Sequence, residues 1–223
     1  MKKKSIIYLI VSVITLSLIT ICIFEKIDNA EYKEYNSVIQ EFHSIINSVY
    51  SDEFEEKYNS FAFLSPNENL QYEWSCMIVD MYSNRKKHTY GYLLYDFDQN
   101  GVKELFLVRD DYFVLAIFTI QDNSLCMLDA FWSKHKCKAS SGDIYIFDSI
   151  TAQDFNCYVK TYDQATTSLI TIKNFGCNKG VYYEEVDNEI IKIDFERYKD
   201  LESPSVNNDF YNKKIKIINT GDG

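Results

Sequence analysis

Between residues 90 and 193 the chain alternates short runs of β-branched and aromatic residues with polar breaks. Breaks such as Asp122-Asn123 and Asp187-Asn188 are typical of tight turns between antiparallel strands. The pattern therefore predicts consecutive hairpins, that is, an antiparallel β-sheet meander. The candidate strands are residues 90–95, 102–108, 113–120, 124–131, 144–148, 157–162, 168–173, 181–186 and 189–193.

The segment before these strands is patterned as helix. From residue 31 to about residue 63, apolar side chains recur at steps of three and four, which predicts an amphipathic helical stalk. A second helix is predicted from Ser65, a capping residue followed by Pro66, to about residue 84. The first stripe consists of Val38, Phe42, Ile45, Ile46, Val49, Tyr50, Phe54, Tyr58 and Phe61, and the second of Leu70, Trp74, Met77, Ile78 and Met81. With a short helix over 195–201, the expected fold class is α+β.

Residues 5–24 carry no charge, and residues 2–4 are all lysine. Such a run spans a hydrocarbon core of about 30 Å as a helix, and the lysines keep its start in the cytoplasm. The sequence thus favours a single-pass anchor with the C-terminal body outside the cell. A cleaved signal peptide, which would leave the protein secreted, is the alternative. We expect an anchor over 1–24, a stalk and helix pair over 25–84, a β domain over 85–202 and a tail over 203–223.

Net charge and cysteine content indicate which partners and which thiol pairings to expect. The formal net charge is −10, which disfavours nucleic acid as a partner and favours divalent cations or basic partners. A solvated acidic surface explains the same charge. Outside the predicted anchor lie five cysteines, an odd number without a Cys-x-x-Cys spacing, so at least one thiol is expected to be free or to pair between chains.

The loop after the first candidate strand has the composition of a calcium cage. Asp96, Asp98 and Asn100 alternate, Gly101 permits a sharp turn, and Glu104 follows at the start of the next apolar run. With the carbonyl of Val102 they form a predicted metal site for Ca²⁺. An EF-hand would place a bidentate glutamate where this chain has an apolar residue. The alternative is an ordinary hairpin turn in which Asp and Asn bond to nearby backbone N–H groups.

The stretch from residue 92 to residue 108, with this loop at its centre, resembles a hairpin of surface-anchored proteins in clostridia-like Gram-positive bacteria. Its Asp-x-Asp-x-Asp-Gly-x-x-Glu-Leu pattern is similar to the calcium loops of FG-GAP-type surface repeats. The resemblance implies a helical N-terminal part, a calcium-binding hairpin and further strands, and it implies no particular activity. Asn100 stands where the third acid usually falls, which removes one formal charge from the cage.

The chain shows no recognisable catalytic motif, so we expect a protein that is not an enzyme. Its histidines, His43, His88 and His135, stand outside known motifs, and Asp110-Asp111 reads as a charged turn. The function expected is a membrane-anchored extracellular binding or structural module with an unknown extracellular protein or glycan as partner. The alternative is a secreted hydrolase-associated domain, or one that recognises glycans or peptides through aromatic residues of its sheet. The aromatic candidates are Tyr112, Phe113, Phe131, Trp132, Tyr145, Tyr158, Tyr162, Tyr182 and Tyr183.

Overall fold

The computed structural model describes residues 33–51, 54, 68–140, 142–149, 151, 154–203 and 209–218, with the backbone alone at residue 68. The chain divides into two compact units, residues 1–38 and 39–223. The first unit contributes η1 (Lys33–Tyr35) and the first residues of α2 (Asn36–Val49). The predicted anchor and the capping residues Ser65 and Pro66 lie outside the described residues. Among the helices that are described, none is long and apolar enough to cross a membrane.

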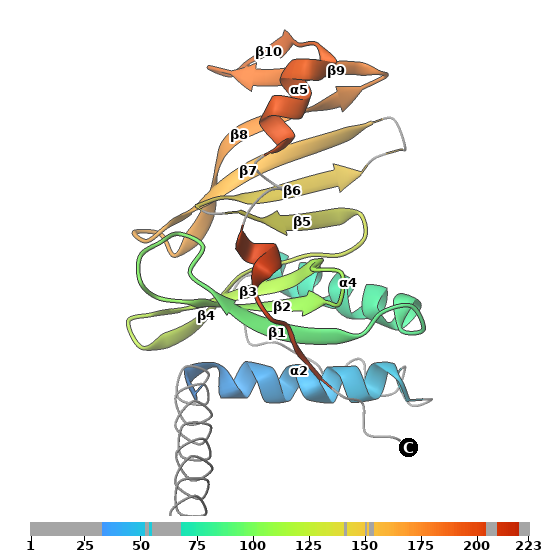
Figure 1. The fold of residues 1–223 in the computed structure, drawn as a ribbon, viewed down its shortest axis with the longest axis vertical. Coiled ribbons are helices and arrows are strands. Elements are labelled where there is room, and N and C mark those ends of the chain that lie inside the picture. Colours follow the sequence, from blue (N-terminus) through green and yellow to red (C-terminus); the bar gives the residue numbers. More distant parts are fainter. Residues whose placement is uncertain are drawn as a thin grey trace, which may run out of the picture. The chain divides into compact units, whose positions relative to one another are not determined.

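The second unit is built on one antiparallel sheet (Figure 1). Its path runs β10-β9-β8-β7-β6-β5-β3-β2-β1-β11, and β4 pairs with β3 beside that path. Most neighbours in space are also neighbours in sequence, so the predicted α+β meander is confirmed. The strands are β1 (Tyr90–Tyr95), β2 (Glu104–Arg109), β3 (Val114–Gln121), β4 (Ser124–Ala130), β5 (His135–Ala139), β6 (Ile144–Ser149), β7 (Phe155–Asp163), β8 (Ser168–Asn178), β9 (Val181–Val186), β10 (Glu189–Lys192) and β11 (Lys216–Ile217).

The meander is interrupted once, at β3. β4 pairs with residues 116–121 of β3, and β5 pairs with the same edge further along, through Val114 and Cys137. Two strands therefore share one edge of β3, which the sequence pattern did not predict. β5 itself was not predicted either, because its sequence His-Lys-Cys-Lys-Ala lacks the bulky side chains that mark a strand.

The tight turns follow the predicted chemistry. Asp122 and Asn123 adopt φ values of 50° and 60°, and Asp187 and Asn188 adopt 53° and 64°. Two consecutive left-handed residues are what a two-residue hairpin requires, and Asp and Asn tolerate that conformation well. These turns fix the registers of β3 with β4 and of β9 with β10.

Within the described residues, three α-helices accompany the sheet. From residue 39 on, α2 buries Phe42, Ile45, Ile46 and Val49, as the apolar stripe predicts, and it ends before Tyr50. α4 (Glu68–Asn84) packs against β4, and its Trp74 ring meets Phe118 edge-on at 5.9 Å. α5 (Phe195–Glu202) is capped by Asp194, whose carboxylate accepts a hydrogen bond from the backbone N–H of Arg197 at 2.8 Å.

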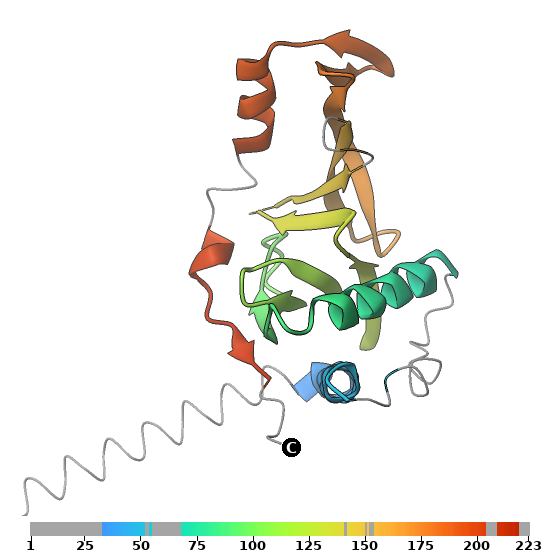
Figure 2. The ribbon, with the colours of Figure 1, turned by 90° about the vertical axis from the view of Figure 1, so that its right-hand side faces the viewer.

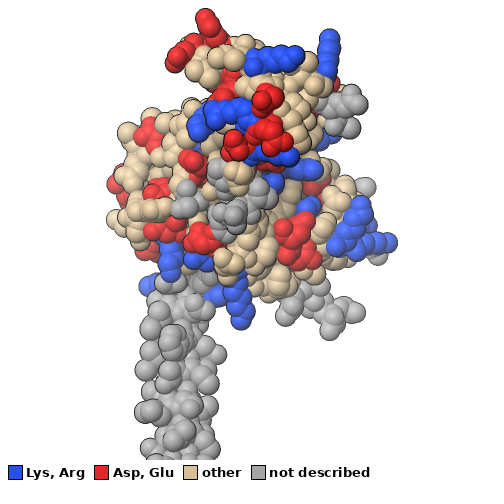
Figure 3. Space-filling model, turned by 45° about the horizontal axis from the view of Figure 1, so that its top comes forward, with Lys and Arg blue, Asp and Glu red and all other residues tan. Residues whose placement is uncertain are grey.

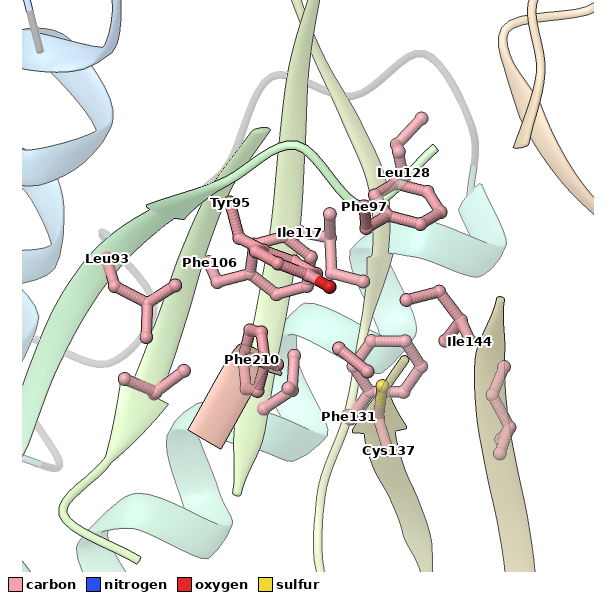
Figure 4. Packing of buried hydrophobic residues seen from close by; sticks show 14 residues of the cluster. Leu93, Tyr95, Phe97, Phe106, Ile117, Leu128, Phe131, Cys137, Ile144 and Phe210 are labelled. Atoms are coloured by element: carbon pink, nitrogen blue, oxygen red, sulfur yellow. The ribbon is translucent and has the colours of Figure 1, made fainter. Parts of the chain in front are cut away.

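The main core lies between the strands of the first half of the sheet and the C-terminal segment (Figure 4). Phe210, in the 3-10 helix η3 (Asp209–Asn212), is fully buried there, with its ring 5.1 Å from that of Phe106 and 5.3 Å from that of Tyr95. β11 then pairs with β1 at the edge of the sheet. The segment from residue 209 to 218 of the predicted tail is thus part of the folded domain. A second cluster joins α5 to β7 and β8.

The five cysteines of the described part are free thiols. Cys137, Cys157 and Cys177 are buried, where they act as small apolar side chains. In this conformation no pair of these described thiols forms a disulfide, which fits the expectation that at least one is free.

Candidate metal centre

The candidate site lies in the connection between β1 and β2, where Tyr95 and Glu104 are the last cross-strand pair. Gln99 and Gly101 have positive φ values of 58° and 88°. Open space surrounds the position that a Cβ of Gly101 would take, so the backbone angle alone favours glycine there. The two left-handed residues curl the loop so that its acidic side chains turn to one side.

Three carboxylates converge in this loop. Oxygen atoms of Asp96, Asp98 and Glu104 lie within 4.8 Å of one another. Two of these acids come from the loop and the third from the first residue of β2, so the pairing of β1 with β2 assembles the group. Oxygen donors at this spacing are the ligands that Ca²⁺ and other hard cations prefer.

Glu104 is the most constrained member of the group. Its side chain is fully buried, as the buried register of this strand predicted. Its Oε2 accepts a hydrogen bond from the backbone N–H of Phe97 at 3.3 Å, and its Oε1 accepts one from the Thr119 hydroxyl at 3.4 Å. Both distances are long for a charged acceptor, so the hydrogen bonds only partly offset the burial of the carboxylate.

Electrostatics favour neutralisation of the group. Burial, and then the nearby negative charge of Asp98, raise the pKa of Glu104 from its ordinary 4.5 to about 8. Burial also raises the pKa of Asp98, and the charge of Asp96 adds to that effect. A divalent cation between the three groups would reverse these shifts, because it favours the ionised form of each carboxylate.

Hydrogen bonds within the loop hold the acids in place. The N–H of Gly101 donates to Asp96 Oδ2 at 3.0 Å, and the N–H of Asn100 donates to Asp98 Oδ1 at 3.2 Å. The other oxygen of Asp96, Oδ1, is buried and has no hydrogen-bond partner. One oxygen of Asp96 therefore shapes the loop, while the other is left for a ligand.

The Asn100 side chain and the backbone N–H of Val102 form hydrogen bonds within the loop. Asn100 Nδ2 donates to Asp98 Oδ2 at 2.8 Å, and Asn100 Oδ1 accepts from the N–H of Val102 at 2.6 Å. The Val102 side chain is exposed and lies just before β2. Leu107, which stands where an EF-hand would have its closing glutamate, is fully buried in β2.

A second group of possible ligands, His88, Asp110 and Asp111, lies at the turn after β2. Arg109 forms two hydrogen bonds with the Asp111 carboxylate, at 3.0 and 2.7 Å, and His88 Nδ1 lies 3.1 Å from Asp110 Oδ1. The Arg109 guanidinium thus pairs with Asp111, and His88 lies beside Asp110, so both carboxylates already have partners in the charged turn that the sequence predicted. The first group is therefore the better candidate for a cation.

All nine aromatic candidates are buried or half-buried. Phe131 and Tyr145 are buried, and Tyr112, Phe113, Trp132, Tyr158, Tyr162, Tyr182 and Tyr183 are half-buried. Sequence reasoning missed Thr119 as a partner of Glu104, because that contact depends on the pairing of β2 with β3.

Comparisons of the chain with protein-family models, with curated proteins and with solved structures found no match.

Proposed function

We propose that this protein is a membrane-anchored extracellular module, for binding or for structure, whose β1–β2 hairpin is stabilised by one calcium ion. The observation that carries the proposal is the convergence of Asp96, Asp98 and the fully buried Glu104 within 4.8 Å. Asn100 and the carbonyl of Val102 complete the proposed ligand set. The ion's role is structural, because it neutralises carboxylates at the rim of the main core.

Placement outside the cell rests on the uncharged segment 5–24 and the lysines before it. Extracellular calcium is abundant enough for a loop of modest affinity, in the millimolar class of extracellular modules. The surface charge is compatible with this setting: acidic and basic side chains are interspersed over the face seen in Figure 3, and the net charge of −10 argues against nucleic acid as a partner.

The test is thermal unfolding of the full chain in detergent micelles, with EGTA and with millimolar calcium. Calcium at a hundred times its dissociation constant adds about 2.7 kcal/mol to the free energy of unfolding. We expect the melting temperature of the parent to rise with calcium, and that of the Asp96→Asn, Asp98→Asn variant to be insensitive to it. The matched control is Asp110→Asn, Asp111→Asn, which removes the same charge from the other acidic group and should keep the calcium response. Identical melts of the parent with and without calcium would refute the site.

A further inference from the structure

The sheet has one weak junction. Its strands form a first half, β11-β1-β2-β3 with β4, and a second half, β5 to β10. Among the described strands, the pair Val114 on β3 and Cys137 on β5 joins the two halves, whereas β1 and β2 pair along their whole length. In Figure 2 the strands of the second half, yellow to orange, extend away from the green strands of the first half. Loops and side chains must therefore help to hold the halves together.

The acidic loop contacts the second half through Phe97. The backbone carbonyl of Phe97 accepts a hydrogen bond from the N–H of Gly142, in the turn between β5 and β6. The carbonyl of Gly142 in turn accepts one from the Thr161 hydroxyl on β7 at 3.1 Å. The fully buried Phe97 ring lies 6.4 Å from the ring of Tyr162 on β7, and it shares the main core with Ile144 of β6 (Figure 4). One residue of the loop thus binds the β5–β6 turn and packs on β7.

The same residue also contacts a proposed calcium ligand. The N–H of Phe97 donates to Glu104 Oε2 at 3.3 Å, and its two neighbours in the chain, Asp96 and Asp98, are the other two acids of the group. A cation that draws the three carboxylates toward one point therefore fixes the backbone on both sides of Phe97. Without a cation, like charges in the group repel one another and favour a wider loop.

We propose that the loop 96–104 is a calcium-dependent latch, in which the bound ion holds Phe97 in the position that docks the β5–β6 turn and β7 onto the first half of the sheet. The inference rests on the proposed function and adds what the ion controls. A ligand shifts an equilibrium only through its different affinities for the two states. In the docked state the three carboxylates converge, whereas release of Phe97 frees the backbone that positions two of them. Calcium therefore favours the docked state.

Other contacts across the junction take no residue from the loop. Gln121 Nε2 on β3 donates to the carbonyl of Gln164, in the turn after β7, at 2.9 Å. Lys160 Nζ on β7 lies 3.5 Å from Asp129 Oδ2 on β4. These contacts keep the halves joined without calcium, so we expect loss of the ion to loosen the junction locally and not to separate the halves.

The experiment is amide hydrogen exchange, measured by mass spectrometry on the full chain in micelles, with EGTA and with calcium. Peptides that cover the loop report its occupancy, because the N–H of Gly101 is bonded to Asp96. Peptides from β5, Gly142 and β6 report docking. The hairpin of β9 and β10 is the internal control, because it lies at the far edge of the second half.

Calcium should slow exchange most where local opening requires release of the ion. In that limit, calcium at a hundred times its dissociation constant slows exchange by about a hundredfold. We expect exchange in β5, at Gly142 and in β6 to slow by about tenfold or more, and exchange in β9 and β10 to change by about twofold at most.

The variant Phe97→Leu, Thr161→Val weakens the latch and keeps every proposed ligand. It removes the ring that packs on β7 and the hydroxyl that binds Gly142. We expect calcium still to protect the loop, with the slowing in β5 and β6 reduced to about threefold or less. The matched control is Phe113→Leu, Thr166→Val, which loses the same atoms from the turn after β2 and the turn after β7. The control should respond as the parent does.

The outcomes separate the latch from the calcium site itself. If calcium slows exchange in the loop of the parent and leaves β5 and β6 unchanged, the latch is refuted and the proposed function stands. Equal slowing in β9 and β10 would show a general stabilisation and would also overturn the latch, as would a full response of β5 and β6 in Phe97→Leu, Thr161→Val. If calcium leaves exchange in the loop unchanged, the site fails and the latch fails with it.

Discussion

The carboxylate of Glu104 is buried at the rim of the main core, where it contacts the backbone N–H of Phe97 and the hydroxyl of Thr119. Its folded-state pKa of about 8 lies above its ordinary 4.5, so without a cation this residue makes the fold less stable as the pH rises from about 4.5 to about 8. When a divalent cation is bound, the pH dependence of this contribution to stability reverses, because the cation favours the ionised form of Glu104.

The variant Glu104→Gln separates these two situations. In EGTA at pH 8.5 we expect it to unfold at the same denaturant concentration as the parent or a higher one, because the amide keeps the shape and removes a buried charge. In calcium we expect the parent to unfold at a higher denaturant concentration than the variant, because the amide is a weaker calcium ligand than the carboxylate. Urea unfolding in the two buffers measures the crossover. A variant that is less stable than the parent by the same amount in both buffers would contradict it.

His135 offers a pH prediction that is independent of the loop. Burial alone would lower the pKa of His135, but the Asp148 carboxylate, which accepts a hydrogen bond from its Nδ1, raises this pKa. The charges of Asp129 on β4 and Glu73 on α4 raise it as well, and the net shift is upward. Lys160 on β7 forms an ion pair with Asp129 at 3.5 Å. The His135–Asp148 pair therefore contributes full stability below about pH 6.5, and that contribution is lost as the pH rises through the folded-state value.

Titration of the His135 ring by NMR checks this directly. We expect a pKa above 6.5 in the parent and a lower value in Asp148→Asn, in which the amide brings no charge. Equal pKa values for His135 in the two proteins would show that Asp148 does not control it.

At the scale of elements, the C-terminal segment closes the sheet by filling its core. Phe210 is fully buried, and beyond it the backbone N–H of Ile218 donates to the carbonyl of Tyr90 at 2.9 Å. Gly91 permits this approach, because a Cβ there would lie 2.5 Å from the carbonyl oxygen of Lys216. One small residue on β1 thus makes room for β11.

Loss of the Phe210 ring should destabilise the domain by about 3–5 kcal/mol, since a large cavity opens in the main core. Urea unfolding of Phe210→Ala measures that value. The control is Phe195→Ala, because this ring is 46% exposed and its loss should cost far less. Similar losses for the two variants would mean that the segment 209–218 does not hold the core.

At the scale of the whole molecule, the proposed function requires the sheet to lie outside the cell. We expect the protein to remain in the membrane fraction after carbonate extraction, and protease added to intact cells to remove the sheet. If the alternative of a cleaved signal peptide holds, the protein is instead recovered from the medium, shortened at its N-terminus. A protein protected from protease in intact cells would contradict both.

The sequence by itself determined the features that depend on neighbouring residues. Most of the strands, the turns at Asp122-Asn123 and Asp187-Asn188 and the acidic loop could be predicted, because local conformational preference and alternation act over a few residues. It also predicted that Glu104 is buried, since both faces of its strand are apolar. The resemblance to surface-anchored proteins stays an expectation.

Only the tertiary structure decided which distant residues meet. β5 and β11 carry weak strand signals and form because neighbouring strands supply their hydrogen bonds. Thr119 reaches Glu104, and Tyr183 reaches Asn156 across Gly176, through the register of whole strands. Such contacts depend on pairing between segments far apart in the chain, and their energies leave no local pattern from which they could be predicted.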